Sequence, residues 1–251
     1  MQWIQANSVY FLSGLVLAVT AVAVLLFFAV RRMLRRKPDS RMTYSPEESE
    51  AFEKHLEANF GPCKSVFHEI SSPDGMHIDL RIIEPTEKFP CRRLFTCGMG
   101  ARAMELPPAV RGKVPDRIEL MLSLPSDWPM DEKSMQEIKF AWPMRLLRFL
   151  ARFPWEESTW IGRGHTIPLE AFAENTRLNG VFFDCFESYP ADAGRIVLSQ
   201  ETAVQILQVV PVYKEEIDYA EKHGSEELAK LLKEIACRPV DIARENYAPK
   251  E

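Results

Sequence analysis

The sequence predicts a mixed α+β domain, in which a β-sheet is flanked by helices, preceded by one transmembrane helix. Three observations support this prediction. An uncharged, apolar run of 21 residues, Tyr10–Val30, lies near the start of the chain. Residues 38–251 are long enough for one globular domain. Within them, strand-like segments come in a run, then helices, then strands again, and this order favours α+β over a regular βαβ array.

The apolar run is long enough to cross a membrane. At about 1.5 Å per residue, such a helix covers the roughly 30 Å hydrocarbon core of a bilayer. A cleaved signal peptide fits less well, because no basic region precedes the run and no small-x-small cleavage site follows it. By the positive-inside rule, the domain is expected to lie in the cytoplasm and the N-terminus outside. The basic residues that set this orientation follow the run directly: Arg31, Arg32, Arg35, Arg36 and Lys37.

Charge and cysteine content narrow the class of protein. The chain has 31 basic and 36 acidic residues, and because five of the basic ones lie in the cluster after the span, residues 38–251 carry a net charge of −10. This disfavours a nucleic-acid binder, which needs a basic face, and favours a basic partner. The cysteines are odd in number and lack metal-binding spacing, which indicates reduced thiols in the cytoplasm. They are Cys63, Cys91, Cys97, Cys185 and Cys237.

The domain is expected to open with a helix after a linker at 38–45. Ser45 is suited to the N-cap, Pro46 to the first turn, and Glu48 to the second half of a capping box. Gly61-Pro62 ends the helix. Its apolar face repeats every four residues: Phe52, Leu56 and Phe60.

Four strands are expected next. A turn at 73–75 joins the first two, at 66–70 and 76–83, and two more follow at 94–97 and 118–124. Alternation in the second strand predicts one buried and one wet face. The residues expected to be buried are Ile78, Leu80 and Ile82, and those expected to be solvent-exposed are His77, Asp79 and Arg81.

The second half of the domain returns to helices and then strands. Helical pattern resumes near Ser134, and Pro143 is expected to divide it and begin a second helix that runs to about Phe153. The four tryptophans of this region are interpreted as core and core-edge residues: Trp128, Trp142, Trp155 and Trp160. The remaining predicted elements are strands at 181–186 and 204–213, helices at 214–223 and 226–236 with Gly224 as a C-cap, and an irregular end from Val240.

A GxGxxA pattern at Gly98–Ala103 follows a predicted strand, and Glu119 lies where a ribose-binding acid would be expected. A dinucleotide site also needs a helix that opens at the second glycine, so that its N-terminus faces the pyrophosphate. Pro107-Pro108 ends any such helix within about one turn. The pattern is therefore interpreted as a tight, close-packed turn.

The most unusual loop is Trp160–Thr166, which combines an aromatic residue, two glycines, an arginine and a histidine. Loops of this composition can bind ligands or partners. An enzymatic alternative makes His165 a base oriented by Asp79 or Glu174, with Cys97 or Cys185 as nucleophile. The candidate partner-binding residues are Trp160, Gly162, Arg163, Gly164, His165, Glu174, Asn175 and Thr176.

A series of short motifs resembles the suppressor-of-fused-like domain family in its bacterial form. The motifs are collinear over roughly Phe52 to Asn246, and each is short, so the series carries the resemblance. They lie at residues 77–83, 96–100, 124–128, 142–143, 149–154, 159–166, 172–176, 211–216 and 240–242.

The resemblance implies a suppressor-of-fused-like fold and a protein-binding domain that is not an enzyme. Animal members of that family sequester a transcription factor, and many bacterial relatives look like immunity proteins that neutralise toxins. The expected protein is thus a single-pass protein of the cell (inner) membrane, whose cytoplasmic domain binds a protein partner, such as a basic toxin domain. No catalytic residue, cofactor or metal site is expected.

Two alternatives remain open. One is a membrane-tethered, hydrolase-like enzyme that uses the His165 loop. The other is a structural membrane scaffold, in which Gly14 and Ala18 form a small-xxx-small pair that lets two spans pack as a homodimer.

Overall fold

The structure is a computed structural model, which describes residues 42–70, 72, 74–184, 192–200, 202–236 and 238–249. Among these residues, no helix has both the length and the apolar character needed to cross a membrane. Several sequence predictions lie outside the described residues. They are the span at 10–30 with Gly14 and Ala18, the basic residues Arg31, Arg32, Arg35, Arg36 and Lys37, and the cysteines Cys185 and Cys237.

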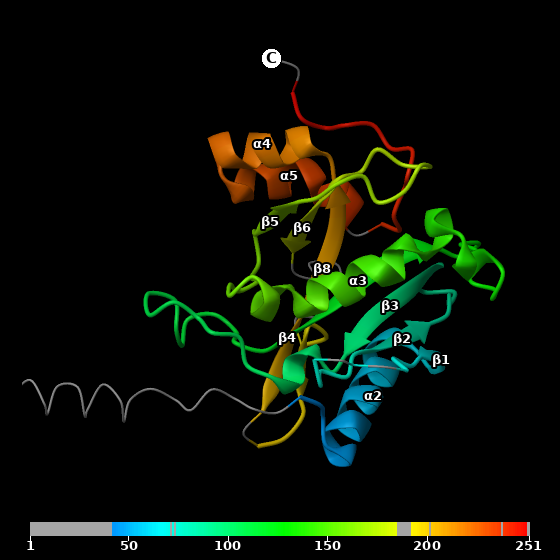
Figure 1. The fold of residues 1–251 in the computed structure, drawn as a ribbon, viewed down its shortest axis with the longest axis vertical. Helices are drawn as coiled ribbons and strands as arrows, with labels where there is room; N and C mark the ends of the chain where they lie inside the picture. The colour runs from blue at the N-terminus through cyan, green and yellow to red at the C-terminus, as the bar shows by residue number, and fades with distance from the viewer. Residues whose placement is uncertain are drawn as a thin grey trace, which may run out of the picture. The chain divides into compact units, whose positions relative to one another are not determined.

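One mixed sheet organises the domain (Figure 1), with strand order β1-β2-β3-β4-β8-β6-β5 and with β7 also paired to β8. The first four strands are antiparallel neighbours: β1 (Cys63–Phe67), β2 (Asp79–Ile83), β3 (Cys91–Cys97) and β4 (Ile118–Pro125). The long strand β8 (Ala203–Val212) pairs in parallel with β4. Antiparallel pairs complete the sheet: β8 with β6 (Gly180–Asp184), β8 with β7 (Arg195–Val197), and β6 with β5 (Thr166–Pro168).

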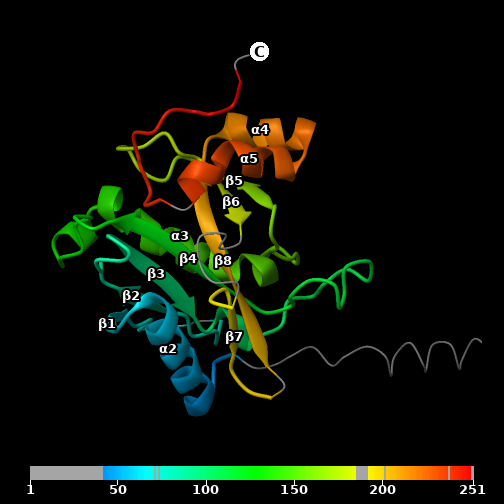
Figure 2. The ribbon, with the colours of Figure 1, turned by 180° about the vertical axis from the view of Figure 1, so that it is seen from behind.

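Helices cover both faces of this sheet. Alternate residues of the strands divide between two faces, and α3 (Ile138–Glu156) packs on the first with Leu147 and Leu150. On the second face, α2 (Pro46–Phe60) packs over β3 and β4, while α4 (Lys214–His223) and α5 (Ser225–Ala236) pack over β6 and β8. Figures 1 and 2 show α3 and α2 on opposite sides of the sheet. The predicted α+β class, a mixed sheet flanked by helices, is confirmed.

Local helix signals predict their elements well. Ser45 caps α2, and the capping box with Glu48 is formed in both directions, at 3.2 Å and 3.0 Å. The helix ends at Gly61, whose φ of 112° is readily adopted only by glycine. The bounds of α4 are as predicted, and Gly224 ends it at a φ of 96°. These signals succeed because each depends only on neighbouring residues.

The predicted hairpin differs from the structure in two respects. The first strand is Cys63–Phe67, earlier than predicted, and the second begins only at Asp79. The prediction of a solvent-exposed face on β2 is also wrong, because Asp79 is buried and Arg81 is half-buried. Arg81 pairs with Glu53 of α2 at 3.6 Å, and His68 and His77 contact the Asp79 carboxylate.

Contrary to the prediction, Pro143 does not divide the helix. It lies inside the continuous helix α3, which follows a short 3-10 turn at Ser134–Gln136. A proline has no N–H for the carbonyl four residues earlier, here that of Lys139. The Asn175 side chain supplies the missing donor, with Nδ2 donating to the Lys139 oxygen at 3.1 Å. A residue distant in sequence thus lets the helix continue through the proline.

Candidate functional site

The glycine-rich pattern forms a tight turn over a buried carboxylate, as predicted. Gly98 has a φ of 122°, and a Cβ there would lie 2.1 Å from the His77 carbonyl oxygen. After it comes only a 3-10 turn, Met99–Ala101. The Gly98 and Gly100 amides donate to Glu119 Oε1 at 2.8 and 3.0 Å. Because Glu119 is fully buried and occupied by this turn, its carboxylate is not presented to a ribose.

The structure does not support two residues of the enzymatic alternative, Cys97 and Asp79. Cys97 is buried, and burial together with the nearby Glu119 raises the pKa of its thiol to about 12. A thiol with that pKa is not ionised near neutral pH and is a poor nucleophile. The Asp79 carboxylate, proposed to orient His165, instead contacts His68 and His77 at 2.9 and 3.0 Å. Cys97 and Asp79 therefore do not form a catalytic site with His165, while Cys185, the other proposed nucleophile, lies outside the described residues.

Contacts within the loop and with β6 hold the loop that contains Trp160 and His165. The two rings meet edge to face, with centroids 4.2 Å apart. The Gly164 amide donates to the Phe183 carbonyl at 2.8 Å, which ties the loop to β6. Gly162 is required for close approach, because a Cβ there would lie 2.5 Å from the Trp160 ring. Burial lowers the pKa of His165, so its imidazole is neutral at pH 7.

Arg163 is the exposed residue of this loop. Its Nε donates to Asp184 Oδ1 at 3.0 Å, and the two side chains are 44% and 8% exposed. The buried carboxylate therefore holds the guanidinium at the surface in a defined position.

The tryptophans of this region are core and core-edge residues, as predicted. Trp128 and Trp142 are buried in the core and meet edge to face, 5.9 Å between centroids. Trp155 and Trp160 are partly buried and pack against the same core.

The second candidate segment, Glu174–Thr176, contacts mainly its own domain. Asn175 donates to the Lys139 carbonyl, and Thr176 Oγ1 donates to the Ile242 carbonyl at 3.1 Å. Thr176 is buried, whereas Glu174 is exposed. Two of the three side chains are thus used inside the domain, and only Glu174 is available to a partner.

We expect Asn175→Ala to destabilise the domain by about 1 kcal/mol, the usual net contribution of one hydrogen bond. The Lys139 carbonyl beneath Pro143 then loses its donor. Urea denaturation of this variant, with Glu174→Ala as the neighbouring exposed control, measures the effect. Equal midpoints for the two variants would contradict this role of Asn175.

The structure reveals a polar cluster at the end of β1 and the start of β2 that the sequence patterns did not predict. His68 Nδ1 lies 2.9 Å from Asp79 Oδ2, and His77 Nε2 lies 3.0 Å from Asp79 Oδ1. The Glu69 amide also donates to Asp79 Oδ1, at 3.0 Å. Asp79 therefore joins two histidines at one point on the surface. We call His68, His77 and Asp79 the histidine cluster.

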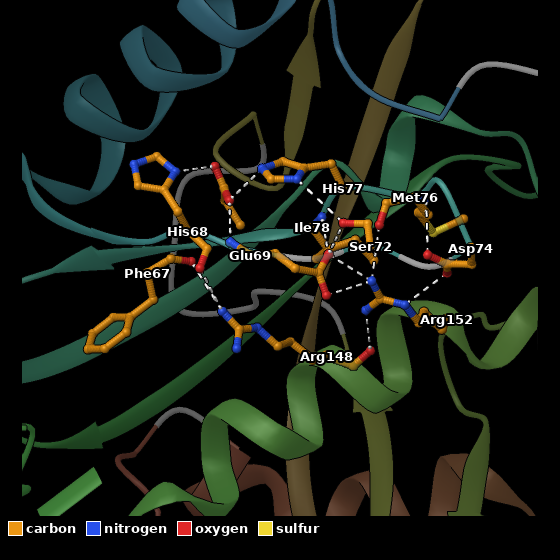
Figure 3. Close-up of polar contacts among 11 residues, drawn as sticks. Phe67, His68, Glu69, Ser72, Asp74, Met76, His77, Ile78, Arg148 and Arg152 are labelled. Carbon is orange, nitrogen blue, oxygen red and sulfur yellow. Dashed lines mark hydrogen bonds and ion pairs between the residues drawn. The ribbon is translucent and has the colours of Figure 1, made fainter. Parts of the chain in front are cut away.

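A network of ion pairs supports the histidine cluster (Figure 3). Arg152 of α3 contacts both oxygens of Glu69 at 2.7 Å, donates to Asp74 at 2.9 Å, and reaches the Met76 carbonyl at 3.0 Å. Burial alone would raise the pKa of Glu69, but hydrogen bonds from the Ile78 amide, Arg152 and Ser72 outweigh it and lower that pKa. Glu69 is thus an ionised anchor between α3 and the β1–β2 connection.

One signal for the histidine cluster was present in the sequence. Phe67 pairs with Leu80 across β1 and β2, so extending the register by one residue places His68 opposite Asp79. His77 precedes Asp79 by two residues, on the same face of an extended chain. The predicted hairpin contained these three residues but not the register, which is why the cluster was not predicted.

The structure is thus a mixed α+β domain with helices on both faces of its sheet. The family profile described as suppressor of fused protein (SUFU) matches residues 74–245. The chain belongs to the suppressor of fused family, which confirms the resemblance seen in the sequence motifs. No curated protein sequence matches the chain.

Solved structures share the fold at low sequence identity. The chain described as "the Sufu-Fu complex crystal structure" matches with a TM-score of 0.57 and 13% identity, over 84% of this chain and 93% of that one. A putative SUFU homologue from Neisseria gonorrhoeae matches with a TM-score of 0.56 and 12% identity, over 83% of this chain and 98% of that one. At these identities the likeness shows a common fold alone.

Proposed function

We propose that this chain is a protein-binding module and not an enzyme. The observation that carries the proposal is the family match over residues 74–245. One of the similar structures comes from a complex between Sufu and Fu, so a protein of this fold takes part in a complex in that case. The buried, protonated thiol of Cys97 and the engagement of Asp79 with two histidines also disfavour the enzymatic alternative.

The proposed setting is a membrane. The apolar run Tyr10–Val30 and the basic cluster that follows it support a single N-terminal span with the domain in the cytoplasm. The net charge of −10 on residues 38–251 supports a basic partner by electrostatic complementarity. An immunity protein bound to a basic toxin domain combines these properties.

The proposed contact surface is the loop Trp160–His165 together with Glu174. Tryptophan and arginine are among the residue types most enriched in binding hot spots. Arg163 is exposed but held by Asp184, and the loop is tied to β6, so binding would order few new groups.

The test is a pull-down of the full-length protein from native membranes, followed by mass spectrometry and by binding measurements with the purified partner. We expect a near-stoichiometric basic protein partner. Replacing both Arg163 and His165 by alanine should weaken partner binding at least about tenfold. This threshold is cautious, because losing a single hot-spot residue usually weakens binding by more.

The matched control replaces an exposed arginine and histidine elsewhere, Arg145 and His223, and should leave affinity unchanged. An equal loss in both double variants would contradict the surface assignment. The absence of any near-stoichiometric protein partner would contradict the function itself.

A further inference from the structure

The histidine cluster has the composition of a metal site. Its three donor atoms, His68 Nδ1, His77 Nε2 and a carboxylate oxygen of Asp79, all lie within 4.8 Å of one another. They lie just after β1 and at the start of β2, so the pairing of the two strands brings the three residues together. Ligands at 2.0–2.2 Å from a tetrahedral zinc ion lie about 3.3–3.6 Å apart. His68 contacts Asp79 Oδ2 at 2.9 Å and His77 contacts Oδ1 at 3.0 Å, so an ion enters the cluster only if the side chains move apart.

We propose that His68, His77 and Asp79 bind a divalent transition-metal ion, with zinc as the best fit. Two imidazole nitrogens and one carboxylate oxygen suit zinc and related metals, whereas magnesium and calcium prefer oxygen ligands throughout. Three protein ligands leave one coordination position for water or for a group from a partner. The bound ion joins the end of the edge strand β1 to the start of β2.

The surroundings of the histidine cluster are arranged as a second ligand shell would be. Ser72 Oγ lies 3.5 Å from His77 Nδ1, the ring nitrogen that faces away from Asp79, and donates to Glu69 Oε2 at 2.9 Å. Glu69 is in turn held by Arg152, and its amide donates to Asp79. Such outer contacts orient ligands and typically contribute tenfold or more to metal affinity. In Figure 3, His77, Ser72, Glu69 and Arg152 form one connected chain of contacts.

An ion has access to the cluster from solvent. The side chains of His68 and His77 are 68% and 44% exposed, while that of Asp79 is 12% exposed. A buried carboxylate with two accessible imidazoles allows binding without unfolding of the domain. The proposal does not depend on the protein-binding function, because its ligands lie outside the proposed contact surface.

The test uses the full-length protein purified without a histidine tag and titrated with zinc sulfate in a calorimeter. We expect one zinc ion per chain, and at least about a tenfold loss of affinity for His68→Ala or His77→Ala. His68→Ala is the primary variant, because this exposed residue is the least needed for folding. Cobalt substitution adds a second measurement, since visible d–d bands report tetrahedral coordination and should disappear in the same variants.

Two controls make the result specific. His223→Ala removes another surface histidine, which packs against Tyr219, and should leave zinc affinity unchanged. An excess of magnesium should not displace zinc. The proposal is overturned if the native chain binds no zinc at about 100 μM, a weak affinity on the usual scale. It is equally overturned if both single variants bind zinc as the native chain does.

Discussion

Glu119→Ala is expected to destabilise the domain by about 3–5 kcal/mol, because it leaves several buried donors without an acceptor. Glu119 is fully buried in β4. Its carboxylate accepts hydrogen bonds from the Tyr44 hydroxyl and the Thr96 hydroxyl, both at 2.5 Å, and from the Gly98 and Gly100 amides. These contacts join the start of the domain, β3 and the glycine turn. Chemical denaturation of the purified variant measures the loss.

Glu119→Gln separates the shape of this side chain from its charge. Burial raises the pKa of Glu119, although its hydrogen bonds oppose that shift. The folded state therefore holds this proton more tightly than the unfolded state, whose carboxyl titrates near 4.5. From that pH up to the raised pKa of the folded state, the native protein should lose stability as pH rises. The glutamine variant lacks this titration, so its stability relative to the native protein should improve with pH. Parallel stability curves from pH 4 to pH 8 would contradict the assigned role.

Elements defined by neighbouring residues could be predicted from the sequence. The cap at Ser45, the stop at Gly61 and the stop at Gly224 act within one turn of a helix, so local sequence was sufficient. The three-residue strands β5 and β7 were missed, because only pairing to β6 and β8 makes them strands. Short segments of this kind carry no periodicity to recognise.

Tertiary contacts explain the wrong predictions. Pro143 predicts a helix boundary unless a distant donor replaces its missing N–H, and Asn175 provides that donor. Arg81 was predicted to be exposed to solvent because alternation shows only that the two faces of a strand differ. In the structure it is half-buried and pairs with Glu53 of α2. In each case the deciding residue lies far away in the sequence.

The candidate functional residues were also predicted only in part, where local sequence was sufficient. The composition of the Trp160–His165 loop identified an unusual segment, and the structure shows it to be an ordered part of the surface tied to β6. The histidine cluster requires the exact register of β1 and β2, which the sequence leaves open by a residue or more. Composition can therefore identify a loop, but a constellation built across strands needs the structure.

Arg244→Ala is expected to cost about 3–5 kcal/mol, the usual effect of breaking a buried ion pair from one side. Arg244 and Glu216 are 6% and 0% exposed and meet through two contacts, at 2.7 and 2.6 Å. Arg244 also donates to the Pro211 carbonyl at 3.1 Å, and the Tyr247 amide donates to Glu216. The pair thus attaches the C-terminal segment 240–249 to α4 and β8. We expect the variant to expose this segment to proteolysis as well as to lower the denaturation midpoint.

Two further variants separate the possible causes of this loss of stability. If the cost comes from an uncompensated buried carboxylate, then adding Glu216→Gln to Arg244→Ala should recover part of the stability, since the amide is neutral and keeps an acceptor for the Tyr213 amide. Lys214→Ala breaks the exposed pair with Asp218 on the same helix and should change the midpoint little, because water screens that pair. A double variant less stable than Arg244→Ala would show that lost packing, and not the isolated charge, dominates. Protection of residues 240–249 from hydrogen exchange distinguishes local release of this segment from global unfolding, and the ion pair predicts that the segment is released first.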